Sequence, residues 1–77
     1  MKNSERILID IDKLDLSFKD IGNIDFTSKE KEIIERAKSY KYDSEYYLEK
    51  GDEMTSFGCI TYSHGLIDAL KMIYGLI

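Results

Sequence analysis

The stretch from Tyr46 to Leu70 constrains the fold more than any other part of this 77-residue sequence. It reads as the end of one helix, a Gly51-Asp52 turn, and the start of a second helix. Glycine readily adopts the left-handed conformation that ends helices, and an aspartate directly after it can cap the next helix. Two helices joined by so short a turn must lie antiparallel. The sequence therefore predicts a helical hairpin.

The helix before this turn has a clear predicted start. Thr27 is the expected N-cap, and Glu30, three residues later, completes a capping box that satisfies free backbone N–H groups. The expected inward face comprises Ile33, Ala37, Tyr40, Ser44 and Tyr47, with Ile34 and Leu48 beside it. Lys50 provides a cation in the last turn, and Gly51 provides the stop. Residues 28–50 are therefore predicted to be helical.

The segment after the turn, residues 53–76, is predicted to form a helix with an unusual face. At about 100° per residue, this face collects Met54, Gly58, Tyr62, Gly65, Ala69, Met72 and Leu76. A glycine inside a helix costs about 1 kcal/mol relative to alanine, so two glycines on one face indicate a packing reason. We expect this face to point into the core, where a neighbouring backbone or the rings of Tyr40 and Tyr47 fill the space.

The first segment of the chain allows two interpretations. Its apolar residues recur at spacings of three and four, as in an amphipathic helix, at Ile7, Ile11, Leu14, Phe18 and Ile21. Alternating apolar residues around Asp12-Lys13 would also suit a β-hairpin, but an isolated hairpin is only marginally stable. We predict a helix over residues 4–21, closed by a left-handed residue at Gly22-Asn23. Residues 1–77 then form one all-α domain, an up-and-down three-helix bundle.

The composition argues against several classes of partner. The net charge is −4, and lysines alternate with glutamates over residues 29–32, so no basic stripe forms and nucleic acid is not expected as the main partner. No apolar run approaches the roughly 20 residues of a membrane span, and no signal segment opens the chain. The single cysteine, Cys59, cannot form an internal disulfide, which suits a cytoplasmic location.

The polar residues do not assemble a catalytic set in the sequence. His64 is the only histidine, and Asp68 lies one turn beyond it, a spacing that could orient an imidazole or contribute to a metal site. A metal needs three or four ligands, and the next candidates, Glu49 and Asp52, lie about 18 Å away along the helix axis. We interpret His64 and Asp68 as a surface pair, or His64 as bonded to a neighbouring helix. We expect no catalytic residue, metal or cofactor, and a buried, inert Cys59.

Three blocks of the sequence carry a family resemblance: YYLEKGD at 46–52, SFGCI at 56–60 and YSHGLIDAL at 62–70. Over a stretch of about residues 33–70, the chain resembles a family of short archaeal proteins known as domain of unknown function 357. The resemblance implies a three-helix bundle in an archaeal cytoplasm. It implies no assigned activity and no cofactor.

A fainter resemblance links the helical hairpin to the helical domains that accompany nucleotidyltransferases in toxin–antitoxin systems. The RNase members of that group carry an arginine four to six residues before a histidine. Here Gly58, Cys59 and Ile60 occupy those positions before His64, so the catalytic pair of those RNases is missing.

Apolar residues outside the predicted core indicate protein–protein contact. The predicted interaction surface comprises Ile9, Leu16, Tyr42, Tyr46, Ile60, Ile67 and Tyr74. On the third helix, Ile60, Ile67 and Tyr74 repeat at heptad spacing, and Ile9 and Leu16 do the same on the first. Soluble monomers usually avoid such patches, and a two-fold homodimer would cover both stripes.

We therefore expect a small non-enzymatic helical module that acts through protein–protein contact, as a homodimer or an accessory subunit. The alternative is a nucleotide- or RNA-associated accessory domain, which rests on the fainter resemblance and on the rings of Tyr42 and Tyr46, because exposed aromatic rings can stack on bases. A third hypothesis is a metal-assisted enzyme built across a dimer interface around His64 and Asp68.

Overall fold

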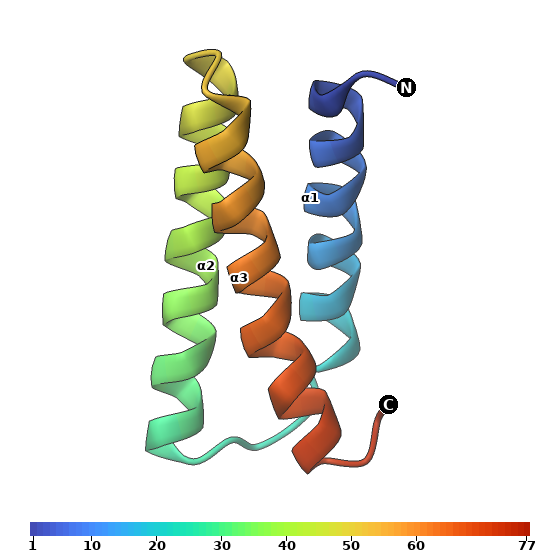
Figure 1. Ribbon diagram of the computed structural model, residues 1–77. Coiled ribbons are helices and arrows are strands. Elements are labelled where there is room, and N and C mark those ends of the chain that lie inside the picture. The colour runs from blue at the N-terminus through green and yellow to red at the C-terminus, as the bar shows by residue number, and fades with distance from the viewer.

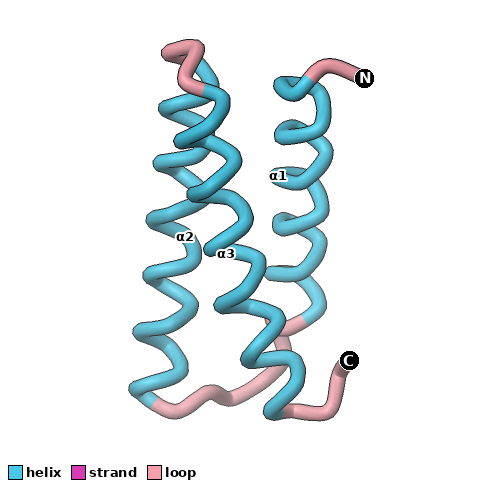
Figure 2. The backbone as a smooth tube through the Cα atoms, in the orientation of Figure 1, coloured by secondary structure: helices cyan, strands magenta, loops and turns pink.

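The computed structural model describes residues 1–77 and contains three α-helices: α1 (Asn3–Asp20), α2 (Ser28–Glu49) and α3 (Glu53–Ile73). Successive helices run in opposite directions, so α1 and α3 point the same way (Figure 1). The connections between helices lie at the two ends of the molecule, which extends over 37 × 22 × 15 Å (Figure 2). The predicted all-α three-helix bundle is confirmed, and each helix begins within one residue of its predicted start.

The start of α2 forms the predicted capping box. The Glu30 N–H donates to the Thr27 hydroxyl at 3.2 Å, and the Thr27 N–H donates to the Glu30 carboxylate at 2.9 Å. The same carboxylate accepts a hydrogen bond from the Tyr74 hydroxyl, which lies just beyond α3. The cap of α2 is therefore also a tertiary contact with the end of the chain.

The turn between α2 and α3 also follows the prediction. Gly51 adopts a φ of +84°, and its N–H donates to the Leu48 carbonyl. The Asp52 carboxylate accepts from the Thr55 N–H at 3.1 Å and from the Thr55 hydroxyl at 2.7 Å, so it caps α3. The Gly-Asp pair thus closes one helix and opens the next.

Two helix ends differ from the prediction. Gly22 is not left-handed: its N–H donates to the Lys19 carbonyl, and only Gly51 and Gly75 have a positive φ. At the other end of the chain, α3 stops before residue 76, because Gly75 adopts a φ of +71° and the Leu76 N–H turns back to the Lys71 carbonyl. The Gly75 N–H also donates to the Met72 carbonyl, and this pair of bonds is the usual way in which a left-handed glycine closes a helix.

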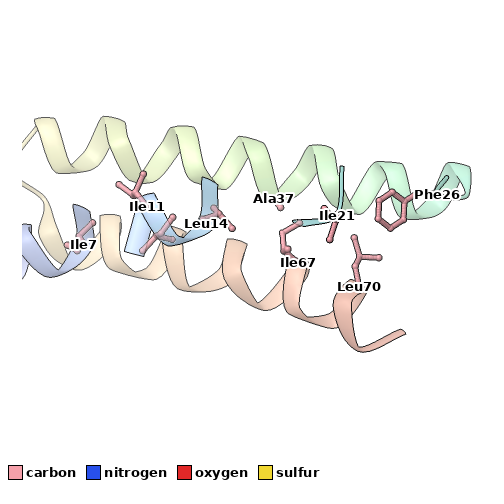
Figure 3. Close-up of a cluster of buried hydrophobic side chains, with 9 residues drawn as sticks. Ile7, Ile11, Leu14, Ile21, Phe26, Ala37, Ile67 and Leu70 are labelled. Carbon is pink, nitrogen blue, oxygen red and sulfur yellow. The ribbon is translucent and has the colours of Figure 1, made fainter. Parts of the chain in front are cut away.

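The hydrophobic core draws residues from all three helices and from the connection between α1 and α2 (Figure 3). Its members are Ile7, Ile11, Leu14, Ile21, Phe26, Ala37, Ile60, Ile67 and Leu70. The predicted apolar stripe of the first helix is therefore confirmed, and the β-hairpin interpretation is wrong. Phe26 packs edge-on against Tyr74 with ring centroids 5.2 Å apart, which closes the core at the α1–α2 connection.

The face of α3 that enters the core is not the predicted one. The inner face of α3 includes Ser56, Ile60, Ser63 and Ile67, which are 0% exposed. The predicted glycine-containing face lies on the exposed side of the helix, where Met54 is 87% exposed. The prediction treated glycine as the residue that lets helices approach, whereas the structure uses serine for this purpose.

The interface between α2 and α3 is closed by serine hydroxyls that bond to backbone carbonyls. Ser44 Oγ donates to the Ser56 carbonyl at 2.8 Å, and Ser56 Oγ donates to the Ser44 carbonyl at 2.7 Å. Further along, Ser63 Oγ donates to the Ala37 carbonyl at 2.6 Å. A serine side chain is short, so each bond requires the two helices to lie close together. No buried side-chain nitrogen or oxygen atom lacks a partner.

The first helix is attached by longer polar side chains. Lys71 of α3 is buried, and its ammonium group lies 3.1 Å from the Ser17 hydroxyl and 3.2 Å from the Asp20 carboxylate. Lys41 of α2 reaches the Asp15 carboxylate at 2.8 Å and so links α1 to α2. The aliphatic stems of these lysines cover apolar surface while the charged ends stay paired.

Candidate functional site

The exposed side of α3 is apolar and poor in charged residues. Asp68 is the only charged residue among the exposed residues of α3. We define the outer face of α3 by Met54, Gly58, Gly65, Ala69 and Met72. Its two methionines are 87% and 68% exposed, and Tyr62 at its edge is 49% exposed. A contiguous apolar surface of this kind marks an interaction site more often than a free surface.

The two glycines of this face have no packing role within the chain. A Cβ atom added to Gly58 or Gly65 would meet no other atom within 4 Å. Each glycine still weakens the helix by about 1 kcal/mol relative to alanine. The close approach that was expected between these glycines and a neighbouring helix therefore does not occur inside the bundle.

Two residues of the predicted interaction surface are buried instead. Ile60 and Ile67 are 0% exposed and belong to the core, so their assignment to a dimer interface is wrong. Their heptad spacing reflects contact with α1 and α2 within one chain. Tyr74, the third member of that stripe, is partly exposed and held by Phe26 and by its bond to Glu30.

Ile9 and Leu16 lie on the exposed side of α1, as predicted. They are 38% and 59% exposed. Because Ile60 and Ile67 are buried, the two exposed stripes that were expected on α1 and α3 do not form together.

Tyr42 and Tyr46 are also exposed, but they do not form a stacked pair. The Tyr46 ring packs edge-on against Tyr47, with centroids 5.2 Å apart, and the Lys50 ammonium group lies 5.5 Å from its centroid. Tyr42 is 73% exposed and has no aromatic partner. The exposed stacked pair that would suit contact with bases is therefore absent.

His64 is bonded to a neighbouring helix, which was one of the two predicted interpretations. Its Nε2–H donates to the Asp10 carbonyl of α1 at 2.7 Å. Asp68 is exposed and makes no hydrogen bond with His64. The imidazole therefore helps to fix α1 on α3, and no His–Asp pair is formed. No group of three His, Cys, Asp or Glu side chains is placed to hold a metal ion.

Cys59 is half-buried on α3. Burial raises the pKa of its thiol above the ordinary value of 9.0, and the carboxylates of Asp43 and Asp52 raise it further. Because only the thiolate is a good nucleophile, these surroundings keep Cys59 in its less reactive form near neutral pH.

The residues that sequence reasoning missed are the two buried serines of α3 and the exposed methionines. Ser56 and Ser63 are seven residues apart and therefore lie on one face of α3 with Ile60 and Ile67. That spacing was the available signal for the inner face. Placing the serines inside would also have placed Met54 and Met72 outside.

A comparison with known proteins extends the family resemblance beyond the stretch expected from sequence motifs. The sequence model of the family described as protein of unknown function (DUF357) matches residues 11–76, which includes the second half of α1. No curated protein matches the chain. None of the three helices is long and apolar enough to cross a membrane. With most of its length matched by that model, this chain belongs to the DUF357 family.

Proposed function

We propose that this protein is a non-enzymatic helical module that acts through protein–protein contact, and that two copies associate through the outer face of α3. The observation that carries the proposal is the pair of open glycines between exposed methionines. Gly58 and Gly65 weaken α3 and contact nothing in their own chain. A second helix on this face would use the space that they leave.

The methionines supply apolar area for such a contact. Met54 is 87% exposed and Met72 is 68% exposed. Full burial of a methionine side chain stabilises by about 1.5–3 kcal/mol, and a two-fold dimer would bury four of them. Methionine also adapts its shape to an irregular partner surface.

An antiparallel pairing of the two α3 helices suits the distribution of residues on the outer face. Met54 and Met72 lie about 27 Å apart along the helix, with both glycines between them. In an antiparallel pair, the Met54 end of one copy meets the Met72 end of the other, and the backbones approach closely at the glycines. A pairing centred between the methionines also keeps the two Asp68 carboxylates about 15 Å apart along the axis, whereas a parallel pairing would place them side by side.

The proposed setting is the cytoplasm, since Cys59 is the only cysteine and stays a free thiol. An accessory-subunit role would use the same apolar surface with a different partner. The nucleotide- or RNA-associated alternative stays a prediction, and no specific observation favours it over protein contact.

Gel filtration with light scattering tests the proposal. We expect twice the 9.0 kDa chain mass for the wild type at micromolar concentration and a monomer for Met72→Glu, with unchanged helical circular dichroism. Leu16→Glu, on the exposed side of α1, is the matched control and should stay dimeric. A wild-type monomer of 9.0 kDa would contradict self-association. A rise in the thermal midpoint with short RNA or nucleotides, for a wild type that stays monomeric, would favour the alternative.

A further inference from the structure

A groove of about 460 Å³ runs between α1 and α2, and every residue that lines it belongs to one of these two helices. Both helices pack closely against α3. Lys41, through its bond to Asp15, is the polar link between α1 and α2. The bundle therefore has an open side between α1 and α2, in the position that a fourth helix would occupy.

The floor of the groove is apolar. Leu8 and Ile11 of α1 and Leu48 of α2 form it. Leu8 is 52% exposed, although most of the apolar face of α1 is buried against α3. A partner side chain entering the groove would therefore meet leucine and isoleucine.

The rims of the groove are acidic on both sides. Asp12 and Asp15 line it from α1, and Glu45 and Glu49 line it from α2. Lys41 is the only cation in the lining, and it lies 2.8 Å from Asp15 and 3.4 Å from Glu45. The four carboxylates and one ammonium leave a net charge of −3.

Two of these carboxylates have no partner within the chain. Asp12 and Glu49 make no ion pair and no side-chain hydrogen bond. They line the groove from opposite helices. A cationic group placed above either one would gain a charge-assisted contact without breaking an existing bond.

We propose that this groove binds an amphipathic helix of a partner protein whose apolar face is flanked by lysine or arginine. The leucine-lined floor would take the apolar side chains, and Asp12 and Glu49 would pair with the basic flanks. The groove runs from Lys41 to Glu49, about 12 Å, which matches two turns of a helix with apolar residues at i, i+3 or i+4, and i+7.

The outer face of α3 in a second copy does not supply such a helix. The exposed apolar side of α3 carries one acidic residue, Asp68, and no exposed cation. The groove is also formed by α1 and α2, so its ligand does not compete with a partner on the outer face of α3. The inference extends the proposed function to a second surface, and either of the two can fail alone.

Calorimetry with three synthetic helical peptides tests the proposal. The peptides share the same leucine spacing and carry lysine, glutamine or glutamate on both flanks. We expect the lysine peptide to bind in the micromolar range, with an affinity that falls as salt rises, and the glutamate peptide to show no binding. Equal binding of all three peptides, or no binding of the lysine peptide, would overturn the proposal.

Matched variants locate the binding site. Asp12→Asn with Glu49→Gln removes two carboxylates that make no intramolecular bond and should weaken binding of the lysine peptide about tenfold. Asp43→Asn with Asp68→Asn removes the same charge away from the groove and should leave the affinity within about twofold. An equal loss of affinity for the lysine peptide in both double variants would overturn the assignment to the groove. The oligomeric mass of the groove variant should equal that of the wild type, which keeps this test separate from the test of self-association.

Discussion

The inner and outer faces of α3 both contain small residues at heptad spacing, but they use them differently. On the inner face, Ser56 and Ser63 are fully buried and bond to carbonyls of α2. On the outer face, Gly58 and Gly65 are exposed and contact no other part of the chain. The inner face thus gains bonds from its close contact, whereas the outer face has the shape for a close contact and no partner for it within the chain.

This difference shows why a small residue alone does not identify a core face. A serine in a close interface gains hydrogen bonds that a glycine cannot make, and a glycine on an exposed helix only weakens it. A helix that keeps exposed glycines therefore needs a reason outside the bundle. In our account, that reason is the proposed contact with a second copy.

The largest expected effect is on the inner face. Ile67→Glu should abolish cooperative unfolding, because it places a carboxylate where the side chain is 0% exposed. The loss of unfolding free energy should exceed about 4 kcal/mol. The total free energy of unfolding is usually about 4–12 kcal/mol for a domain of about this length. Circular dichroism during urea titration measures it. Met72→Glu, on the outer face, should unfold within about 0.5 kcal/mol of the wild type under conditions where both are monomeric.

A smaller effect is expected where α2 and α3 lie closest. Ser63→Leu should destabilise by about 3 kcal/mol, because the larger side chain separates the helices and the Ala37 carbonyl loses its donor. Ser63→Ala removes only the hydrogen bond and should cost about 1 kcal/mol. Urea denaturation midpoints of the two variants give the comparison. Equal losses would show that the close approach of the helices is not what the serine provides.

The glycines of the outer face should respond in the opposite direction. Gly65→Ala should stabilise the monomer by up to about 1 kcal/mol, because alanine favours the helix and its Cβ meets no atom within 4 Å. The same change should weaken self-association, because the two backbones could no longer approach as closely. Thermal unfolding at low concentration measures the first effect, and sedimentation velocity measures the second. A stabilised variant that associates as tightly as the wild type would show that the glycine is not part of a contact.

The smallest effect concerns the end of α3, where Tyr74 bonds to Glu30. This bond lowers the pKa of Glu30 below 4.5 and raises the pKa of Tyr74 above 10.0. The contribution of Glu30 to the stability of the fold is therefore present above pH 4.5 and is lost as the pH falls through its lowered pKa. The contribution of Tyr74 to the stability of the fold is present below pH 10.0 and is lost as the pH rises through its raised pKa.

Tyr74→Phe tests this bond. The variant should return the pKa of Glu30 toward its ordinary value, apart from the part held by Thr27, as followed by a carbon-detected NMR titration. Its unfolding midpoint should differ from that of the wild type near neutral pH and converge with it at low pH. An unchanged pKa of Glu30 would mean that the capping box alone sets it.

Much of the fold could be predicted from local chemistry. The Thr27–Glu30 capping box, the left-handed Gly51 and the Asp52 cap each depend on a few consecutive residues, and all three are confirmed. The left-handed residue expected at Gly22 was wrong, although that position also contains a glycine. A glycine permits a positive φ and does not require it.

The orientation of α3 could not be predicted in the same way. Both of its sides contain small and apolar residues, so the periodicity is compatible with either side facing inward. The choice depends on contacts with residues distant in sequence, such as the bonds from Ser56 to Ser44 and from Ser63 to Ala37. For the same reason, the placement of Ile60 and Ile67 on a surface was wrong, and the exposed methionines were not recognised.

Position-specific cross-linking tests the central claim, that the outer face of α3 is a contact between two copies, most directly. The variant Tyr62→Cys in a Cys59→Ser background carries one thiol, at an exposed position near the centre of the proposed contact that leaves both glycines unchanged. With a short bis-maleimide reagent, we expect a covalent dimer at Tyr62→Cys and little dimer at Tyr42→Cys, an exposed position on α2. No dimer at position 62, or equal dimer at both positions, would contradict the claim.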